Sequence, residues 1–182
     1  KRLEKPENTG NMRKIKILFV CHGNICRSPM AEFILKDMTT QRSISSDFII
    51  ASAATSNEEI GNHIYPPAKA ELARHGIGGK AAPSQNPAAR RRLAVEVEEK
   101  TARRIRRSDY EEYDYLIAME SFNIRNMLRE FGTDPENKIH RLLDFSDRPG
   151  DIDDPWYTRR FDITYEEIVT GCEAFLRHLG YE

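Results

Sequence analysis

Short apolar runs alternate along the chain with longer segments in which apolar residues recur every three or four positions. The short runs predict buried strands at 15–20, 48–54, 115–119 and 139–143. The periodic segments predict helices that begin at Ser28–Pro29, Pro67, Ser121 and Thr164. This alternation predicts an α/β fold of three layers, in which helices cover both faces of a four-stranded parallel sheet.

Local signals predict where the helices start and stop. Ser28 is expected to be the N-cap of the first helix, with Pro29 as its first helical residue. Ser121 is expected to cap the helix that carries Phe122, and Gly76 to end the helix that begins at Pro67.

One segment, 78–114, is long for a connection between neighbouring elements. Its first part is rich in Gly, Ala, Pro and Ser and predicts a mobile loop. Helix-favouring residues then predict an exposed helix over 88–107. Arginine clusters in this region could bind an acidic partner, but the interleaved glutamates favour a solvated helix face.

Length and charge limit the classes of protein that fit. The 182 residues suit one domain, taken as 13–182, with 1–12 as a flexible N-terminal extension. A net charge of -1 gives no general attraction to nucleic acid or anionic lipid. The chain contains neither an apolar run of about 18 residues nor the apolar region of a secretory signal. These features predict a cytoplasmic protein that binds neither nucleic acid nor membrane.

The stretch VCHGNICRSP joins the first predicted strand to the first predicted helix. Backbone amides at a helix N-terminus bind oxyanions, Asn24 tolerates left-handed geometry, and Gly23 relieves steric limits on the turn. Arg27 adds a planar guanidinium suited to phosphate oxygens. The predicted oxyanion-binding residues are His22, Gly23, Asn24, Ile25, Cys26, Arg27 and Ser28.

Cys21 lies where a bound phosphate would rest. Positive surroundings favour its thiolate, which can attack phosphorus in line. A nucleotide-binding loop fits less well, because it would end in Gly-Lys-Ser/Thr and this loop ends in Cys-Arg-Ser. Only three cysteines are present, too few for a disulfide scaffold. Cys26 either fills the turn or forms a reversible disulfide that protects Cys21; the residues leave both open.

A leaving oxygen must be protonated, so the reaction needs a general acid. The candidates are Asp153 and Asp154, which precede Pro155 in an acidic loop. Proline stiffens that loop, and the adjacent Trp156 and Tyr157 could wall a pocket for a flat ring.

These two motifs, taken together, resemble those of the low-molecular-weight protein tyrosine phosphatase family. VCHGNICRSP matches its signature without a gap, and DDPWY resembles its distal Asp-Pro-aromatic motif. The likeness covers roughly 13–182. It implies catalysis that needs neither metal nor cofactor and proceeds in two steps, with the phosphate-binding loop after the first strand.

The resemblance also implies residue roles. Cys21 is the nucleophile, Arg27 holds the phosphoryl group, and Asp154 acts as acid and then as base. The supporting polar network comprises Asn24, Ser28 and Ser52, and the pocket residues are Glu58, Trp156 and Tyr157.

Departures from the family pattern concern substrate and length. Ile25 favours phosphotyrosine, since relatives that resemble arginine phosphatases carry Thr there. The segment near 79–99 resembles an insertion, which leaves open whether Lys100 stands where some relatives carry a network His. Glu58 replaces an aromatic pocket residue and is expected to disfavour strongly acidic peptides.

Three alternatives remain: a thioredoxin-coupled arsenate reductase on the same fold, an arginine-phosphate phosphatase, and a non-enzymatic phosphate-binding module. An arsenate reductase would need relay cysteines, and only Cys172 lies outside the loop. The expected partners are a tyrosine-phosphorylated protein, and inorganic phosphate or other tetrahedral oxyanions as inhibitors. The chain is expected to be a monomer or a weak dimer.

Overall fold

The computed structural model describes residues 13–79 and 86–182. Four parallel strands form one sheet in the order β2-β1-β3-β4. They are β1 (Ile15–Cys21), β2 (Phe48–Ala54), β3 (Tyr115–Ala118) and β4 (Ile139–Arg141). The predicted strands and the α/β class are therefore confirmed, although the run at 139–143 leaves the sheet after Arg141.

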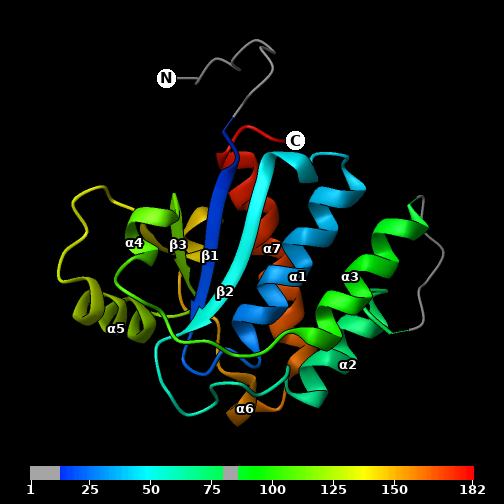
Figure 1. The fold of residues 1–182 in the computed structure, drawn as a ribbon, viewed down its shortest axis with the longest axis horizontal. Helices are drawn as coiled ribbons and strands as arrows, with labels where there is room; N and C mark the ends of the chain where they lie inside the picture. Colours follow the sequence, from blue (N-terminus) through cyan, green and yellow to red (C-terminus); the bar gives the residue numbers. More distant parts are fainter. Residues whose placement is uncertain (1–12, 80–85) are drawn as a thin grey trace.

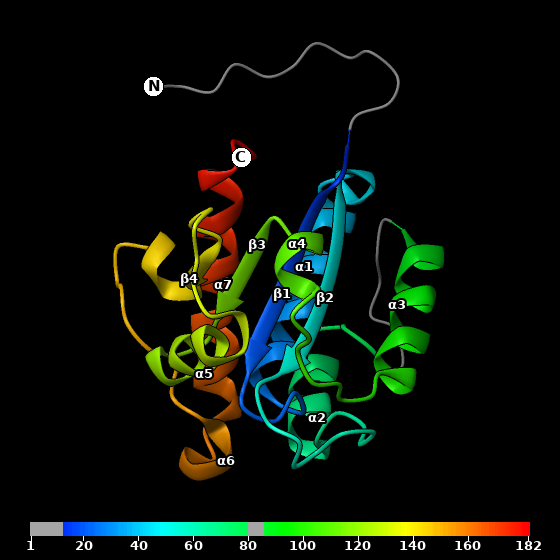
Figure 2. The same ribbon diagram turned by 60° about the vertical axis from the view of Figure 1, so that its left-hand side comes forward.

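Helices lie on both sides of this sheet (Figures 1 and 2). The α-helices are α1 (Arg27–Gln41), α2 (Pro66–Arg74), α3 (Pro87–Glu99), α4 (Asp109–Glu112), α5 (Ser121–Phe131), α6 (Pro155–Thr158) and α7 (Phe161–His178). Two 3-10 turns complete the described chain, η1 (Ser45–Asp47) and η2 (Leu142–Phe145). No helix of residues 13–79 and 86–182 combines the length and apolarity needed to cross a membrane.

Alternation along β1 divides the core into two parts. Ile17 and Phe19 face the larger cluster, which includes residues of α1, α2 and α7. Leu18 and Val20 face the smaller cluster, to which α5 contributes Met127. Because all four side chains are fully buried, β1 is fixed from both faces, and its carboxyl end presents Cys21 at a set position.

Close packing also fixes α7 against the turn after β4. A Cβ atom added at Gly171, in the middle of α7, would come within 2.5 Å of Cγ of the buried Leu142. The helix therefore approaches η2 more closely than any side chain at position 171 would allow.

The region of the long connection differs from its prediction. The helix ends at Glu99, so the expected helix over 88–107 is wrong for residues 100–107. From Lys100 onward the chain is extended and pairs with the end of β2, where Ala54 N donates to Arg103 O and Ile105 N to Ala54 O. Arg103 forms a two-point ion pair with the buried Asp109, so this arginine does not lie on the solvated helix face that the sequence predicts.

The helix α3 packs against the rest of the domain. Its buried Leu93 and Val97 join the larger core cluster, and Glu96 pairs with Lys36 of α1 at 2.9 Å. The loop predicted before it falls mainly on residues outside the described part of the chain. Two predictions about domain organisation stay untested. One is that the segment near 79–99 is an insertion into the 13–182 domain, and the other is that 1–12 is an N-terminal extension.

Candidate active site

The loop between β1 and α1 holds the sulfur of Cys21 in a polar cradle. Ser28 Oγ lies 3.0 Å from Cys21 Sγ, and Asn24 N donates to the same sulfur at 3.3 Å. Cys21 is only 3% exposed. A backbone amide and a hydroxyl therefore contact a sulfur that is shielded from bulk water.

Two expectations about this loop need correction. The left-handed residue is Asn24, at φ 58°, whereas Gly23 does not have positive φ. A Cβ at Gly23 would make an ordinary 3.4 Å contact with Glu59, so glycine is not required there by strain. Ser28 is not the N-cap: α1 begins at Arg27, and the Ser28 hydroxyl faces Cys21 instead of capping the helix.

The predicted polar network is assembled beneath the loop. Asn24 Nδ2 donates to Ser28 Oγ at 2.8 Å and to Ser52 Oγ at 2.9 Å. Asn24 Oδ1 accepts from Arg103 N at 3.2 Å. Asn24 thus joins the loop to β2 and to the extended segment after α3, and all of its polar capacity is directed inward.

The network continues to Glu32, which the sequence reading missed. Ser52 Oγ donates to Glu32 Oε1 at 2.6 Å, and Glu32 also pairs with Lys36 at 2.7 Å. Lys100 Nζ lies 3.4 Å from Glu32 Oε1 and donates to Ser52 O at 3.1 Å. Burial lowers the pKa of Lys100, and Glu32 opposes that shift. The structure therefore places Lys100 in this network.

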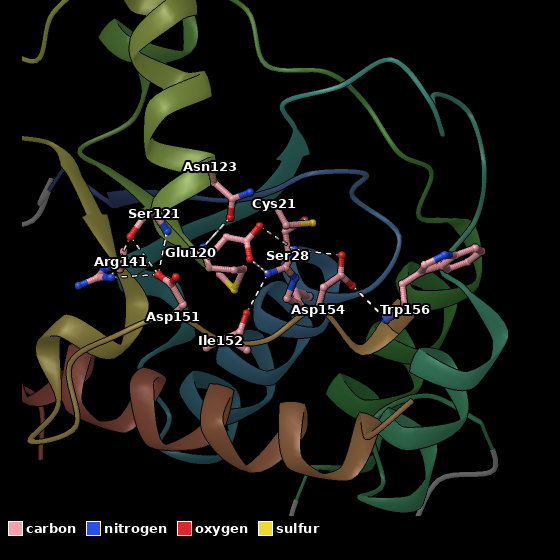
Figure 3. A network of polar contacts seen from close by, with 12 residues as sticks. Cys21, Ser28, Glu120, Ser121, Asn123, Arg141, Asp151, Ile152, Asp154 and Trp156 are labelled. Atoms are coloured by element: carbon pink, nitrogen blue, oxygen red, sulfur yellow. Dashed lines mark hydrogen bonds and ion pairs between the residues drawn. The ribbon is translucent and has the colours of Figure 1, made fainter. Parts of the chain in front are cut away.

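Arg27 makes a second group of contacts, with Glu120, Ile152 and Asp154, three residues that Figure 3 labels. Its side chain is 2% exposed. Nη1 pairs with Glu120 Oε2 at 2.9 Å and donates to Ile152 O at 2.8 Å, and Nη2 lies 3.3 Å from Asp154 Oδ2. Burial alone would lower the pKa of Arg27, but Cys21, Glu120 and Asp154 raise it overall. The guanidinium is therefore charged and held in one orientation.

Glu120 is a further residue that the sequence reading missed. It is the N-cap of α5 and forms a capping box with Asn123, so the expected cap at Ser121 is wrong. Ser121 instead bonds Asp151, and Phe122 is 46% exposed. A signal was present, because an acidic residue directly after a buried strand lies at the carboxyl edge of a parallel sheet.

Of the two candidate acids, the structure brings only Asp154 to Arg27. Asp154 is the N-cap of α6, where its Oδ1 accepts from Trp156 N at 3.0 Å while Oδ2 faces Arg27. Its neighbour Asp153 is exposed. Figure 3 shows the Asp154 carboxylate on the same side of the loop as Cys21.

Of the predicted pocket residues, Glu58 contacts the loop directly, through His22. Glu58 Oε2 lies 3.0 Å from His22 Nε2. Trp156 packs against Tyr65, with ring centroids 4.8 Å apart, and Tyr157 is 83% exposed. The sequence reading missed Tyr65.

The other two cysteines differ from Cys21. Burial, and then the negative charges of Cys21 and Asp154, raise the pKa of Cys26 far above its ordinary value. Burial does the same for Cys172 in α7. All three are free thiols in the structure. Whether Cys26 pairs with Cys21 under oxidation remains a prediction.

A buried thiol, a fixed guanidinium and a carboxylate at the carboxyl edge of a parallel sheet define a cysteine-dependent phosphatase. The family model described as "Low molecular weight phosphotyrosine protein phosphatase" matches residues 16–92 and 79–182. The chain therefore belongs to the low molecular weight phosphotyrosine protein phosphatase family, and the resemblance carried by its two motifs is confirmed.

Individual relatives agree with that assignment. The low molecular weight protein-tyrosine-phosphatase YfkJ of Bacillus subtilis is 32% identical over 170 residues, covering 92% of this chain and 97% of the relative. Its crystal structure gives a TM-score of 0.80, with 94% and 98% of the two chains covered. The Pongo abelii low molecular weight phosphotyrosine protein phosphatase is 34% identical over 165 residues, with 88% and 92% covered. The crystal structure of Drosophila arginine phosphatase is 27% identical, with a TM-score of 0.73 and 92% and 99% covered.

Proposed function

We propose that the chain hydrolyses phosphotyrosine in proteins, and small aryl phosphates, through a phosphocysteine intermediate. The observation that carries the proposal is the placement of Cys21 and Asp154 around one buried guanidinium, that of Arg27. Relatives at 32% and 34% identity that are named as tyrosine phosphatases support the substrate class.

In the first step the Cys21 thiolate attacks phosphorus. A sulfur–phosphorus bond forms while the bond from phosphorus to the tyrosine oxygen breaks, and Asp154 donates its proton to that oxygen. Arg27 and the amides of 22–28 bind the remaining phosphoryl oxygens and stabilise their charge in the transition state.

In the second step a water molecule attacks the phosphocysteine. The Asp154 carboxylate takes a proton from the water, the sulfur–phosphorus bond breaks, and inorganic phosphate leaves. The cycle restores the Cys21 thiolate and protonated Asp154. Because the product occupies the same cradle, inorganic phosphate and other tetrahedral oxyanions are expected to inhibit competitively.

Substrate selection is assigned to the rim of the loop. Trp156 and Tyr157 form the aromatic wall, and Glu58 disfavours strongly acidic peptides through like-charge repulsion. Ile25 favours an oxygen ester over phosphoarginine. A free thiol at Cys21 suits a reducing compartment, so we expect a cytoplasmic phosphoprotein as partner and a monomer or weak dimer as the working form.

The test compares substrates in one assay. The chain should release p-nitrophenol from p-nitrophenyl phosphate with a burst, and release phosphate from a phosphotyrosine peptide faster than from a phosphoarginine peptide. Cys21→Ser should abolish both activities. Preference for phosphoarginine would instead favour the activity named for the Drosophila neighbour. Thioredoxin-dependent reduction of arsenate without ester hydrolysis would favour a reductase, and phosphate binding without turnover would favour a binding module.

A further inference from the structure

Tyr65 stands between the cysteine loop and the segment that carries the general acid. Its backbone N donates to Ile25 O at 2.9 Å, so the residue is fixed to the loop itself. It is also the N-cap of α2, a nine-residue helix that packs on α1 and α7. The backbone of Tyr65 therefore belongs to the rigid part of the domain.

The side chain of Tyr65 contacts the acid segment in two ways. Its ring packs on Trp156, with centroids 4.8 Å apart and planes at 49°. Its hydroxyl accepts a hydrogen bond from Arg159 Nη1 at 3.0 Å. The Arg159 guanidinium also lies over both rings, 5.7 Å from the Trp156 centroid and 5.9 Å from that of Tyr65. Aromatic and cation–π contacts of this kind favour one fixed arrangement.

Of the two residues that Tyr65 contacts, Trp156 lies within α6 and Arg159 directly follows it; Asp154 caps this single turn of helix. The turn has four residues, and a helix this short is not stable without contacts to the rest of the protein. Trp156 N bonds Asp154 Oδ1, so a movement of Trp156 also moves the carboxylate. Arg159 ends the turn in left-handed geometry at φ 60°.

We propose that Tyr65 is a positioning residue for the general acid: through Trp156 and Arg159 it holds α6 so that Asp154 lies over Arg27. This inference rests on the proposed function, because it assigns Tyr65 an effect only through proton transfer by Asp154. Loss of the contact leaves Cys21 and the phosphate cradle intact and impairs protonation of the leaving oxygen.

The experiment measures kcat/KM for two substrates that differ in leaving group. Phenyl phosphate releases phenol, whose pKa is close to the value of about 10 for tyrosine, so it needs the acid. p-Nitrophenyl phosphate releases a far more acidic phenol and needs it less. In Tyr65→Ala, kcat/KM for phenyl phosphate should fall about tenfold more than for p-nitrophenyl phosphate. Tyr65→Phe, which keeps the ring and loses the hydrogen bond, should give a smaller difference of the same sign.

Arg159→Met should resemble Tyr65→Phe. Its matched control is Arg160→Met, which removes the same charge from the next residue; Arg160 pairs with Asp162. The control should change both substrates equally or not at all. In an Asp154→Asn background, Tyr65→Phe should have no further effect on the ratio of the two rates, since the two residues act in one step.

Equal losses for the two substrates in Tyr65→Phe, or an additive effect on top of Asp154→Asn, would overturn the positioning role. Failure of the proposed function would look different. In that case Cys21→Ser would retain turnover, or Asp154→Asn would leave the ratio of the two substrates unchanged in the wild-type background. Thermal unfolding of each variant confirms that the comparison is made on folded protein.

Discussion

Asp154 Oδ2 lies 3.3 Å from Arg27 Nη2, so the proposed acid and the proposed phosphate ligand are in contact before any substrate binds. Arg27 is anchored independently by Glu120 and by Ile152 O. A bound phosphoryl group can therefore replace Asp154 as a partner of Nη2 without releasing the guanidinium. The Asp154 carboxyl group is then free to donate a proton when protonated and to accept one when ionised.

The first prediction concerns that carboxylate. Asp154→Asn should lower kcat/KM for phenyl phosphate by about 100-fold or more, because the leaving oxygen loses its proton donor. Asp153→Asn is the matched control: it makes the same change at the exposed neighbouring residue and should have little effect. Steady-state rates on both variants check this, and equal losses in the two would contradict the assignment of the acid.

Glu120 is predicted to hold the guanidinium in place. Glu120→Gln leaves the buried Arg27 with a neutral partner and should cost about 1–3 kcal/mol of unfolding free energy, together with a higher KM. Glu130→Gln removes a partner of the more exposed Arg104 and should cost less than about 1 kcal/mol. Urea unfolding and substrate titration measure both variants, and similar stability losses would argue against a special role for Glu120.

Lys100 is predicted to balance the charge of Glu32 beneath the loop. Lys100→Met removes one of the two cationic partners of Glu32, and the more negative local charge should slow iodoacetate alkylation of Cys21 by roughly threefold. The double variant with Glu32→Gln should recover the rate. Lys100→Arg keeps the charge and serves as the control. If the alkylation rate of Cys21 in Lys100→Met equalled that of the wild type, the charge of Lys100 would have no measurable effect on the reactivity of the sulfur.

The three thiols are predicted to react selectively. Burial raises the pKa of Cys26 and of Cys172, so both remain protonated across the neutral range, where thiol reagents need the thiolate. Mass spectrometry after brief iodoacetamide treatment at neutral pH should find the label on Cys21. Inorganic phosphate at an inhibitory concentration should slow the labelling of Cys21, because it occupies the same cradle. Faster labelling of Cys26 would mean that its surroundings differ from those described.

Packing of α7 yields a prediction on stability. Gly171→Ala should destabilise the fold by about 1–3 kcal/mol, because the new methyl group meets the buried Leu142. Thr170→Ala, at the exposed adjacent position, should be neutral or slightly stabilising through its helix propensity. Thermal and urea unfolding compare the two, and a stabilised Gly171→Ala variant would show that Leu142 repacks at no cost.

The sequence allowed the sheet to be predicted well, because each strand is a short apolar run. For β2 the predicted bounds, 48–54, are those observed. Local helix propensity gave a wrong prediction where the chain pairs with a distant strand. Residues 100–107 favour a helix, yet the backbones of Arg103 and Ile105 bond that of Ala54 at the end of β2. The predicted N-cap of the first helix was wrong for a similar reason, because the Ser28 hydroxyl contacts the sulfur of Cys21 and does not cap its own helix.

Some residues of the candidate site could likewise be predicted from the sequence, and others could not. Cys21, Arg27 and Asp154 were visible because each lies in a contiguous motif with a chemical reason for its order. Glu32, Glu120 and Tyr65 belong to no such motif, and only the packing of α1, α5 and α2 around the loop brings them to it. Their roles depend on distances between elements that a single sequence does not encode locally.

The three inward hydrogen bonds of Asn24 have a consequence for biosynthesis. They join the nucleophile loop to Ser28, Ser52 and Arg103. The contacts of Arg27 are made with residues still later in the chain, Glu120, Ile152 and Asp154. A nascent chain leaving the ribosome therefore carries its reactive thiol well before the groups that shelter and direct it have been synthesised. Catalytic competence should therefore appear late and all at once, which makes turnover a sensitive reporter of completed folding.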